Sequence, residues 1–248
     1  ADDTRWSCLA TLQGLQRRLN MTTEWQCLTD ADAIASRATT IILQTAQKAI
    51  AAHGQFRIVL AGGSTPTQVY QQLATAQADW SSWQIYFGDE RCLPADATGR
   101  NSVMATRAWL SHVVIPQDNI HTIHAELGAV RAAHEYATII DAALPFDLVL
   151  LGMGEDGHTA SLFPGDQHSA NESVHAVSNA PKPPPERVSL SRASLSNSQQ
   201  VLVLVSGASK HDALQRWRAG NTLPIATITA LRRLVVLYDD QAAGQSSE

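Results

Sequence analysis

The pattern of apolar and polar positions alternates between amphipathic stretches and short apolar runs. The longest amphipathic stretch runs from Asp32 to Ala52, with a candidate N-cap at Asp30 and a stop at Gly54. The positions that define its core-facing side recur at helical spacing, at Ile34, Ala38, Ile41, Thr45 and Ala49. The pattern therefore predicts one long helix.

Short runs rich in β-branched or aromatic residues follow this helix and have the length of strands. They are residues 57–61, 83–87, 146–152, 201–207 and 234–238. Stretches with a mixed apolar and polar face separate them and predict helices at residues 67–76, 101–110, 130–144 and 210–217. Near-continuous apolar strands that alternate with helices predict an α/β fold with a mainly parallel sheet covered on both faces.

Two stretches bear on domain organisation. Residues 1–20 are interrupted by charges and contain no apolar h-region or clear cleavage site, so they do not have the pattern of a signal peptide. We expect residues 1–20 to be an extension outside the core, the alternative being a genuine N-terminal helix. The Pro-rich residues 179–191 are short and lead into a β-like segment, which predicts an ordered loop within one domain over residues 21–248.

Composition and charge exclude several classes of protein. A hydrophobic fraction of 44% over 248 residues is ample for a buried core. The sequence contains no run of 18 apolar residues, so it predicts no membrane span. The net charge of -5, without a polybasic run, argues against nucleic acid as a partner. Cys8, Cys27 and Cys92 are far apart and odd in number, so we expect a reducing, cytoplasmic setting.

Each of four predicted strands is followed at once by an unusual polar cluster. The clusters are AGGSTP after residues 57–61, GDER after 83–87, GEDGHTAS after 146–152 and SGASK after 201–207. Ligands of open α/β sheets bind beyond the carboxyl ends of the strands. We therefore expect the four clusters to meet in one site.

Two of these clusters point to an anion such as phosphate. Gly62 and Gly63 allow a sharp turn and close approach of a ligand, and Ser64 or Thr65 can cap the next helix. A helix N-terminus with hydroxyls and N–H groups binds phosphate well, although an ordinary capped turn has the same pattern and the P-loop signature is absent. Lys210 starts a helix, where a cation is unfavourable unless an anion lies nearby; the alternative is a solvated surface lysine.

The GDER cluster offers an acid and a guanidinium beside the expected anion site. Asp89 can bind sugar hydroxyls, and Arg91 can carry negative charge, whereas the alternative is a solvated charged loop. Cys92 is expected to fill space rather than to act as a nucleophile, because no histidine is adjacent in sequence.

The segment LLGMGEDGHTASLFPG contains glycines in the G-x-G-x-x-G spacing of a dinucleotide-binding turn. Such a turn leads into a helix of several turns, yet Pro164 follows soon after Gly157, and Asp156 would place a carboxylate among the amides that hold a pyrophosphate. We expect instead that the glycines bend the chain to present Asp156 and His158 together at the strand end.

His158 is the best general-base candidate, and a nearby carboxylate can orient its ring and stabilise the imidazolium. The alternative is a histidine that is hydrogen-bonded into a loop. His121 and His124 have a ligand-like spacing, but without an H-E-x-x-H motif or paired carboxylates we expect no metal site.

Five motifs, in this order, resemble those of the 6-phosphogluconolactonase family over about residues 25 to 240: LAGGSTP, FGDERCLP, LLGMGEDGHTASLFPG, PKPPPERVSLS and SGASK. The resemblance implies a three-layer α/β/α sandwich with a modified Rossmann topology, which the family shares with glucosamine-6-phosphate deaminases. It implies hydrolysis of 6-phosphoglucono-δ-lactone in the oxidative branch of the pentose phosphate pathway. It also implies no metal and no organic cofactor.

The resemblance assigns roles to individual residues. His158 becomes the general base, with Asp156 as its neighbour in the site. Arg91 and Lys210 become the cationic ligands of the substrate, and we expect Arg91 to face the developing oxyanion. The phosphosugar pocket is expected to be formed by Gly62, Gly63, Ser64, Thr65 and Asp89, with Arg187 beside it. In the loop PADATGRNS, which departs from the family pattern, only Asn101 resembles the family.

Two other functions stay open at this point. An aminosugar-phosphate isomerase or deaminase would share the DGH turn and the glycine loop, but similar deaminases carry a Met-Asp-Glu-Tyr-like run where this chain has GDER. A non-catalytic regulator that binds phosphosugars would need no general base. The presence of an acid, a histidine and cations together argues against such a regulator.

Overall fold

The computed structural model describes residues 23–166, 169 and 171–245, and these form a large parallel sheet and a small antiparallel one. The large sheet has the strand order β1-β9-β8-β5-β2-β3, and all its pairings are parallel. Its strands are β1 (Glu24–Leu28), β2 (Phe56–Leu60), β3 (Trp83–Phe87), β5 (Phe146–Gly152), β8 (Ser198–Val205) and β9 (Arg233–Asp239). The predicted mainly parallel sheet is confirmed; β1 was not predicted.

The small sheet has the order β4-β7-β6, with bounds Asp89–Arg91, Arg187–Leu190 and Val174–Val177. The sequence pattern did not predict β4 or β6, although a β-like segment was expected where β7 lies. These strands are too short and too polar for a period to stand out. β4 pairs with β7 from a distant part of the chain, and β6 pairs with β7 across the Pro-rich loop, so only this pairing defines them.

The long predicted helix is α2, Ala31–His53. Its N-cap is Asp30, whose side-chain oxygen accepts a hydrogen bond of 2.8 Å from the amide of Ala33. Gly54 ends the helix in the left-handed conformation, with φ 81°. Both boundary predictions are confirmed, and the reason is the local hydrogen bonding available to an aspartate and a glycine at those positions.

The other helices are α3 (Ser64–Leu73), α4 (Asn101–Ala105), α5 (Ala129–Ala143), α6 (Arg192–Ser196), α7 (His211–Arg218) and α8 (Asp240–Ala243). Four of them, α3, α4, α5 and α7, lie near their predicted positions, whereas the short helices α6 and α8 were not predicted. The predicted helix over 101–110 continues beyond α4 as a π-helical turn, Thr106–Leu110. Short 3-10 turns occupy Trp80–Ser82, Gln117–Asn119, Ala125–Leu127, Ala208–Lys210 and Ile225–Thr227.

The predicted capping of α3 by Ser64 or Thr65 is wrong. Both residues lie inside the first turn of the helix, and the N-cap position is Gly63, with φ 113° and no side-chain cap hydrogen bond. The reason is that Gly63 adopts a backbone conformation that side chains disfavour, which lets the helix start one residue earlier than a hydroxyl cap requires. Pro66 lies in the first turn of α3, where the fixed φ of proline suits a helix start.

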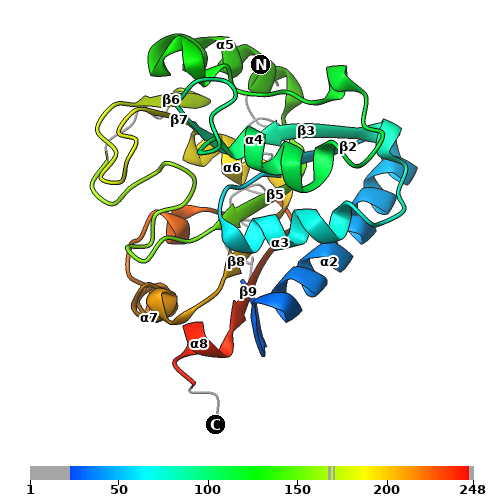
Figure 1. The fold of residues 1–248 in the computed structure, drawn as a ribbon. Coiled ribbons are helices and arrows are strands. Elements are labelled where there is room, and N and C mark those ends of the chain that lie inside the picture. The colour runs from blue at the N-terminus through cyan, green and yellow to red at the C-terminus, as the bar shows by residue number, and fades with distance from the viewer. Residues whose placement is uncertain (1–22, 167–168, 170, 246–248) are drawn as a thin grey trace, which may run out of the picture.

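Helices flank the six-strand sheet. Helix α2 packs across it, contacting β1, β2, β5, β8 and β9, and α3 lies beside α2 (Figure 1). Helix α5 packs on β6 and β7 of the small sheet. The central strands are buried along nearly their whole length, as expected of parallel strands covered on both faces. A group of aromatic side chains, Phe56, Trp80, Trp83 and Trp109, fills one end of the core.

The order of the strands reverses between β2 and β5. From β2 the chain forms β3 on one side, and it later returns to place β5 on the other side of β2, with β8 and β9 beyond it. Loops that leave the carboxyl ends of β2 and β5 consequently diverge, and a crevice opens between them. The topology thus determines where a ligand can bind.

Two of the predictions concern the organisation of the chain into an extension and a domain. The predicted extension over residues 1–20 lies outside the described residues, and the single domain over residues 21–248 stays a prediction.

Cys27 is exposed and Cys92 half-buried, and both are free thiols. Among the helices of the described residues, none is long and apolar enough to cross a bilayer.

Removing the cap of α2 tests the local account of the fold. Asp30→Ala deletes the acceptor for the amide of Ala33, so the free energy of unfolding is expected to fall by about 1 kcal/mol. Urea titration measures this change at a constant m-value. Gln47→Ala, on the exposed side of the same helix, is the control; equal effects of the two substitutions would contradict the assigned cap.

Candidate functional site

A cavity of about 280 Å³ opens at the carboxyl ends of β2 and β5. As expected, all four polar clusters contribute to its wall. Seven of the predicted site residues line it: Gly62, Gly63, Asp89, Arg91, His158, Arg187 and Lys210. The strand reversal therefore gathers residues that are up to 148 positions apart in sequence, from Gly62 to Lys210.

Three predicted site residues lie next to this cavity without lining it. Ser64 and Thr65 form the first two positions of α3, directly after the lining residue Gly63. Asp156 contacts His158 instead of the cavity. Conversely, Asn101 and Lys182 line the cavity, and sequence reasoning gave neither a role. The sequence signal for Lys182 was its position in PKPPPERVSLS, one of the motifs that carry the family resemblance.

His158 and Asp156 form a hydrogen-bonded pair. Nδ1 of the His158 ring lies 2.5 Å from Oδ1 of Asp156, and the His158 amide donates to the same oxygen over 3.1 Å. Burial raises the pKa of Asp156, but the hydrogen bonds from His158 outweigh it, so the pKa lies below its ordinary value. An ionised carboxylate on Nδ1 leaves the lone pair of the neutral ring on Nε2, where it can accept a proton.

Two glycines of the turn that carries His158 lie where a side chain would collide with its neighbours. A Cβ atom on Gly154 would collide with the imidazole of His158, so that position must be glycine for the ring to lie where it does. Gly157 has φ 84°, and a Cβ there would press against Leu223. After Gly157 the chain forms turns and an isolated bridge, without a helix up to Gly165. This geometry agrees with the rejection of a dinucleotide-binding turn.

Asp89 is buried and its carboxylate is bonded to protein groups. Ser161 donates to Oδ2 over 2.6 Å and the Asn101 amide donates to Oδ1 over 2.9 Å. Burial raises the pKa of Asp89, and the hydrogen bond from Ser161 opposes that rise. Asp89 therefore fixes the side chain of Asn101, which lines the cavity with it, and that of Ser161, which does not.

Four cationic side chains surround the cavity: Arg91, Arg187, Lys182 and Lys210. Nε of Arg91 is buried and has no partner among the described residues. Burial lowers the pKa of Lys210, and repulsion from the ammonium of Lys182 lowers it further. This concentration of positive charge in a chain of net charge -5 favours an anionic ligand.

The histidines considered as metal ligands are engaged elsewhere. His121 bonds to Gln84 over 2.9 Å and stacks on Tyr86, and His124 pairs with Glu135 at 3.8 Å. Across residues 23–166, 169 and 171–245, no group of three or more His, Cys, Asp or Glu side chains is placed to hold a metal ion.

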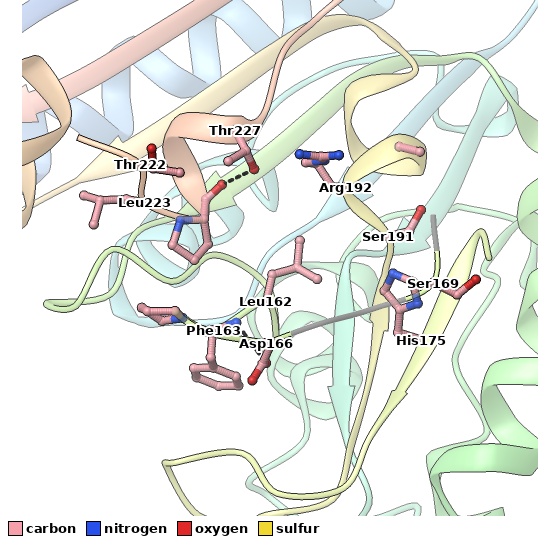
Figure 2. Close-up of a pocket in the computed structure, with 14 residues that line it drawn as sticks. Leu162, Phe163, Asp166, Ser169, His175, Ser191, Arg192, Thr222, Leu223 and Thr227 are labelled. Atoms are coloured by element: carbon pink, nitrogen blue, oxygen red, sulfur yellow. Dashed lines mark hydrogen bonds between the residues drawn. The ribbon is translucent and has the colours of Figure 1, made fainter. Parts of the chain in front are cut away.

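A second, larger cavity of about 590 Å³ lies beside the first but contains none of the predicted site residues. Leu162, Phe163, His175, Arg192 and Leu223 are among its lining residues (Figure 2). The ring of Phe163 packs at 4.8 Å from the His158 ring. Because His158, which pairs with Asp156, and the cluster of cations line the smaller cavity, we place the candidate active site there.

The chain matches the family model described as "Glucosamine-6-phosphate isomerases/6-phosphogluconolactonase" over residues 29–236. A 6-phosphogluconolactonase of Mycobacterium leprae is 34% identical over 244 residues, which cover 91% of this chain and 99% of that protein. The chain belongs to this family.

Solved structures of the family have the same fold. The crystal structure of 6-phosphogluconolactonase from Thermotoga maritima has a TM-score of 0.83 at 28% identity and covers 88% of this chain and 100% of that chain. A monomeric glucosamine-6-phosphate deaminase has a TM-score of 0.79 at 20% identity, covering 90% of this chain and 100% of that chain; this likeness concerns the fold alone. The family resemblance expected from the motifs is confirmed.

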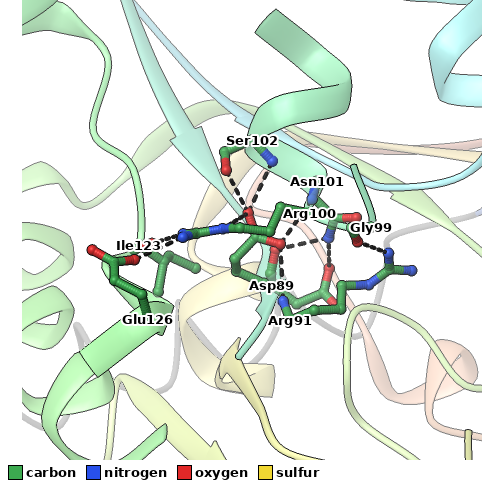
Figure 3. A network of polar contacts seen from close by, with 9 residues as sticks. Asp89, Arg91, Gly99, Arg100, Asn101, Ser102, Ile123 and Glu126 are labelled. Atoms are coloured by element: carbon green, nitrogen blue, oxygen red, sulfur yellow. Dashed lines mark hydrogen bonds and ion pairs between the residues drawn. The ribbon is translucent and has the colours of Figure 1, made fainter. Parts of the chain in front are cut away.

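In this member of the family, a buried ionic network holds the loop that follows β4 (Figure 3). The carboxylate of Glu90 is fully buried and accepts hydrogen bonds from the amides of Asn101 and Ser102 over 2.7 and 2.9 Å. Nε of Arg100 lies 3.4 Å from Glu90, and its Nη1 lies 2.7 Å from Glu126. Glu90 thereby fixes the loop that links the site residues Asp89 and Arg91 to Asn101.

The burial of Glu90 predicts a large loss of stability on its neutralisation. Glu90→Gln removes the buried negative charge beside the guanidinium of Arg100. The free energy of unfolding is therefore expected to fall by about 3 kcal/mol or more. Glu126→Gln is the matched control, because Glu126 pairs with the same arginine near the surface and is expected to cost less than about 1 kcal/mol. Urea unfolding that gave equal losses would refute the role of burial.

Proposed function

We propose that this chain is a 6-phosphogluconolactonase, a hydrolase that opens 6-phospho-D-glucono-1,5-lactone to 6-phospho-D-gluconate in the oxidative branch of the pentose phosphate pathway. The observation that carries the proposal is the Asp156–His158 pair beside a cavity ringed by cations. Family membership and the names of the relatives support it. A cytoplasmic location belongs to the same proposal.

The cations bind the phosphate of the substrate. Lys210 and Arg187 contribute charge, and the first turn of α3, which begins at Ser64 and Thr65, adds backbone N–H groups without a side-chain cap. Asp89 and its hydrogen-bonded neighbours lie where sugar hydroxyls would be bound. Anchoring the phosphate sets the lactone carbonyl near His158, which turns an encounter in solution into a positioned reaction.

His158 then acts as the general base. Nε2 takes a proton from a water molecule as the water oxygen attacks C1 of the lactone, and the resulting negative charge on the carbonyl oxygen faces Arg91. As the carbonyl re-forms, the bond from C1 to the ring oxygen breaks and the imidazolium returns its proton to that oxygen. Asp156 stabilises the imidazolium between the two transfers. The proposal includes no metal ion and no organic cofactor.

The decisive experiment measures acid release from freshly prepared 6-phosphogluconolactone above its spontaneous hydrolysis. Release that depends on the protein supports the hydrolase. Ammonia release from glucosamine 6-phosphate would instead support a deaminase, although the GDER run favours the lactonase. Phosphosugar binding without turnover would support a non-catalytic regulator.

The role of His158 predicts the response to its removal. His158→Ala is expected to lower kcat by about 100-fold to 10,000-fold, because no other group takes the proton from water, with a smaller change in KM. Steady-state kinetics measure both constants. His112→Ala, at an exposed histidine that bonds to the carbonyl of Arg107, serves as control; unchanged turnover of the His158 variant would remove it as the base.

The role of Asp156 predicts a separate effect. Asp156→Asn keeps the size of the side chain but weakens the preference for a proton on Nδ1, so kcat is expected to fall by about 100-fold or more while substrate still binds. An unchanged urea midpoint together with a KM close to that of the parent protein distinguishes this from misfolding. Full kcat in the Asp156→Asn protein would show that Asp156 does not act through His158.

A further inference from the structure

Lys182 lies in the cavity wall although it comes from the Pro-rich loop between β6 and β7. Its side chain is 39% exposed, so the ammonium borders both the cavity and solvent. Lys210 lines the same cavity, and the two ammonium groups are close enough for the charge of Lys182 to disfavour the charge of Lys210. Two amines that repel one another across a cavity form a site for a multiply charged anion.

Arg187 holds the backbone that carries Lys182. Its Nε donates to the carbonyl of Pro184 over 3.1 Å, and its Nη2 donates to the carbonyls of Lys182 and Pro183 over 3.0 and 3.1 Å. Three of the five N–H groups of this guanidinium are thus used by the loop. Arg187 also lies over the ring of Phe163, at 5.6 Å from its centroid, and Phe163 packs on His158. The loop is therefore fixed relative to the histidine.

Glu155 is the present partner of Lys182. Nζ of Lys182 lies 2.9 Å from Oε1 of Glu155, a side chain that is 60% exposed. Glu155 precedes Asp156 in the turn that carries His158. The hydrogen bond from Lys182, followed by the charges of Lys182 and Lys210, lowers the pKa of Glu155. The carboxylate thus engages the ammonium of Lys182 that a phosphate in the cavity would need, and it also feels the charge of Lys210.

We propose that Lys182 is a second phosphate-binding ammonium of this site, and that Glu155 is a counter-ion which the substrate phosphate displaces; this inference rests on the proposed function. An exposed ion pair contributes little stability, so exchanging its carboxylate for a phosphate dianion costs little. The phosphate gains a charge-assisted hydrogen bond from Lys182 in addition to that from Lys210. Glu155 meanwhile competes with every anion that approaches.

The proposal predicts opposite effects for the two members of the pair. Lys182→Ala is expected to raise KM for 6-phosphogluconolactone about tenfold, the cost of one hydrogen bond to a charged group, with kcat within about twofold. Glu155→Gln is expected to lower KM about two- to fivefold, because it removes a like charge from beside the phosphate. Lys182→Arg restores most of the affinity. A merely structural salt bridge would give the same sign for both substitutions.

Two controls make the test specific. Lys48→Ala removes an exposed lysine of α2 and is expected to leave KM unchanged. With glucono-δ-lactone, which lacks the phosphate, the two substitutions are expected to change kcat/KM several-fold less than with 6-phosphogluconolactone. An unchanged KM in Lys182→Ala, or a raised KM in Glu155→Gln, would overturn the proposal.

Calorimetric binding of 6-phosphogluconate separates this proposal from the proposed function. If the parent protein lacks lactonase activity but binds 6-phosphogluconate, and Lys182→Ala weakens that binding about tenfold, the phosphate site stands and the lactonase assignment fails. If lactonase activity is present and both variants bind as the parent does, the assignment stands and Lys182 has no role in phosphate binding. Absence of binding by the parent would overturn the phosphate site directly.

Discussion

The parallel pairing of β2 with β5 is the constraint on which the rest of the structure depends. Ile58 lies opposite Leu148 and Val59 opposite Val149, and this register brings the glycine loop after β2 beside the histidine turn after β5. β3 lies on one side of this pair and β8 on the other. The loops at the carboxyl ends of β2 and β5 therefore diverge and leave a cavity. The apolar strands thus build the polar site, because burial of their side chains on both faces leaves the strand ends as the place for charged groups.

The carboxylates at and near this cavity differ in their burial and in the protein groups that they bond. Asp89 is buried and bonded to Ser161 and Asn101, so it shapes the cavity floor. Glu90 is buried and fixes the loop that carries Arg91. Glu155, by contrast, is exposed and holds only a surface ion pair with Lys182. Buried carboxylates therefore build the site, while the exposed one can be exchanged for a ligand at low cost.

Most of the main sheet could be predicted because its strands are near-continuous apolar runs and its helices have a clear period. The Asp30 and Gly54 boundaries of α2 were also local, since each depends on hydrogen bonds within a few residues. The small sheet was missed, because β4 and β6 are short, carry polar side chains and form only by pairing with β7. The start of α3 was misjudged for a related reason: a positive φ at Gly63 supplies the N-cap position that the hydroxyls of Ser64 and Thr65 were expected to fill.

The sequence by itself determined the chemistry available to this protein: the DGH turn, the GDER cluster and the SGASK cluster, each after an apolar strand. It could not determine which of these groups face a ligand. The tertiary structure decided that Asp156 supports His158 from outside the cavity lining, that Arg187 spends much of its guanidinium on the Pro-rich loop, and that Lys182 enters the cavity. Residue types are given by the sequence and local turns follow from short-range forces, whereas the direction of a side chain depends on hydrogen bonds to groups that only the folded chain brings near.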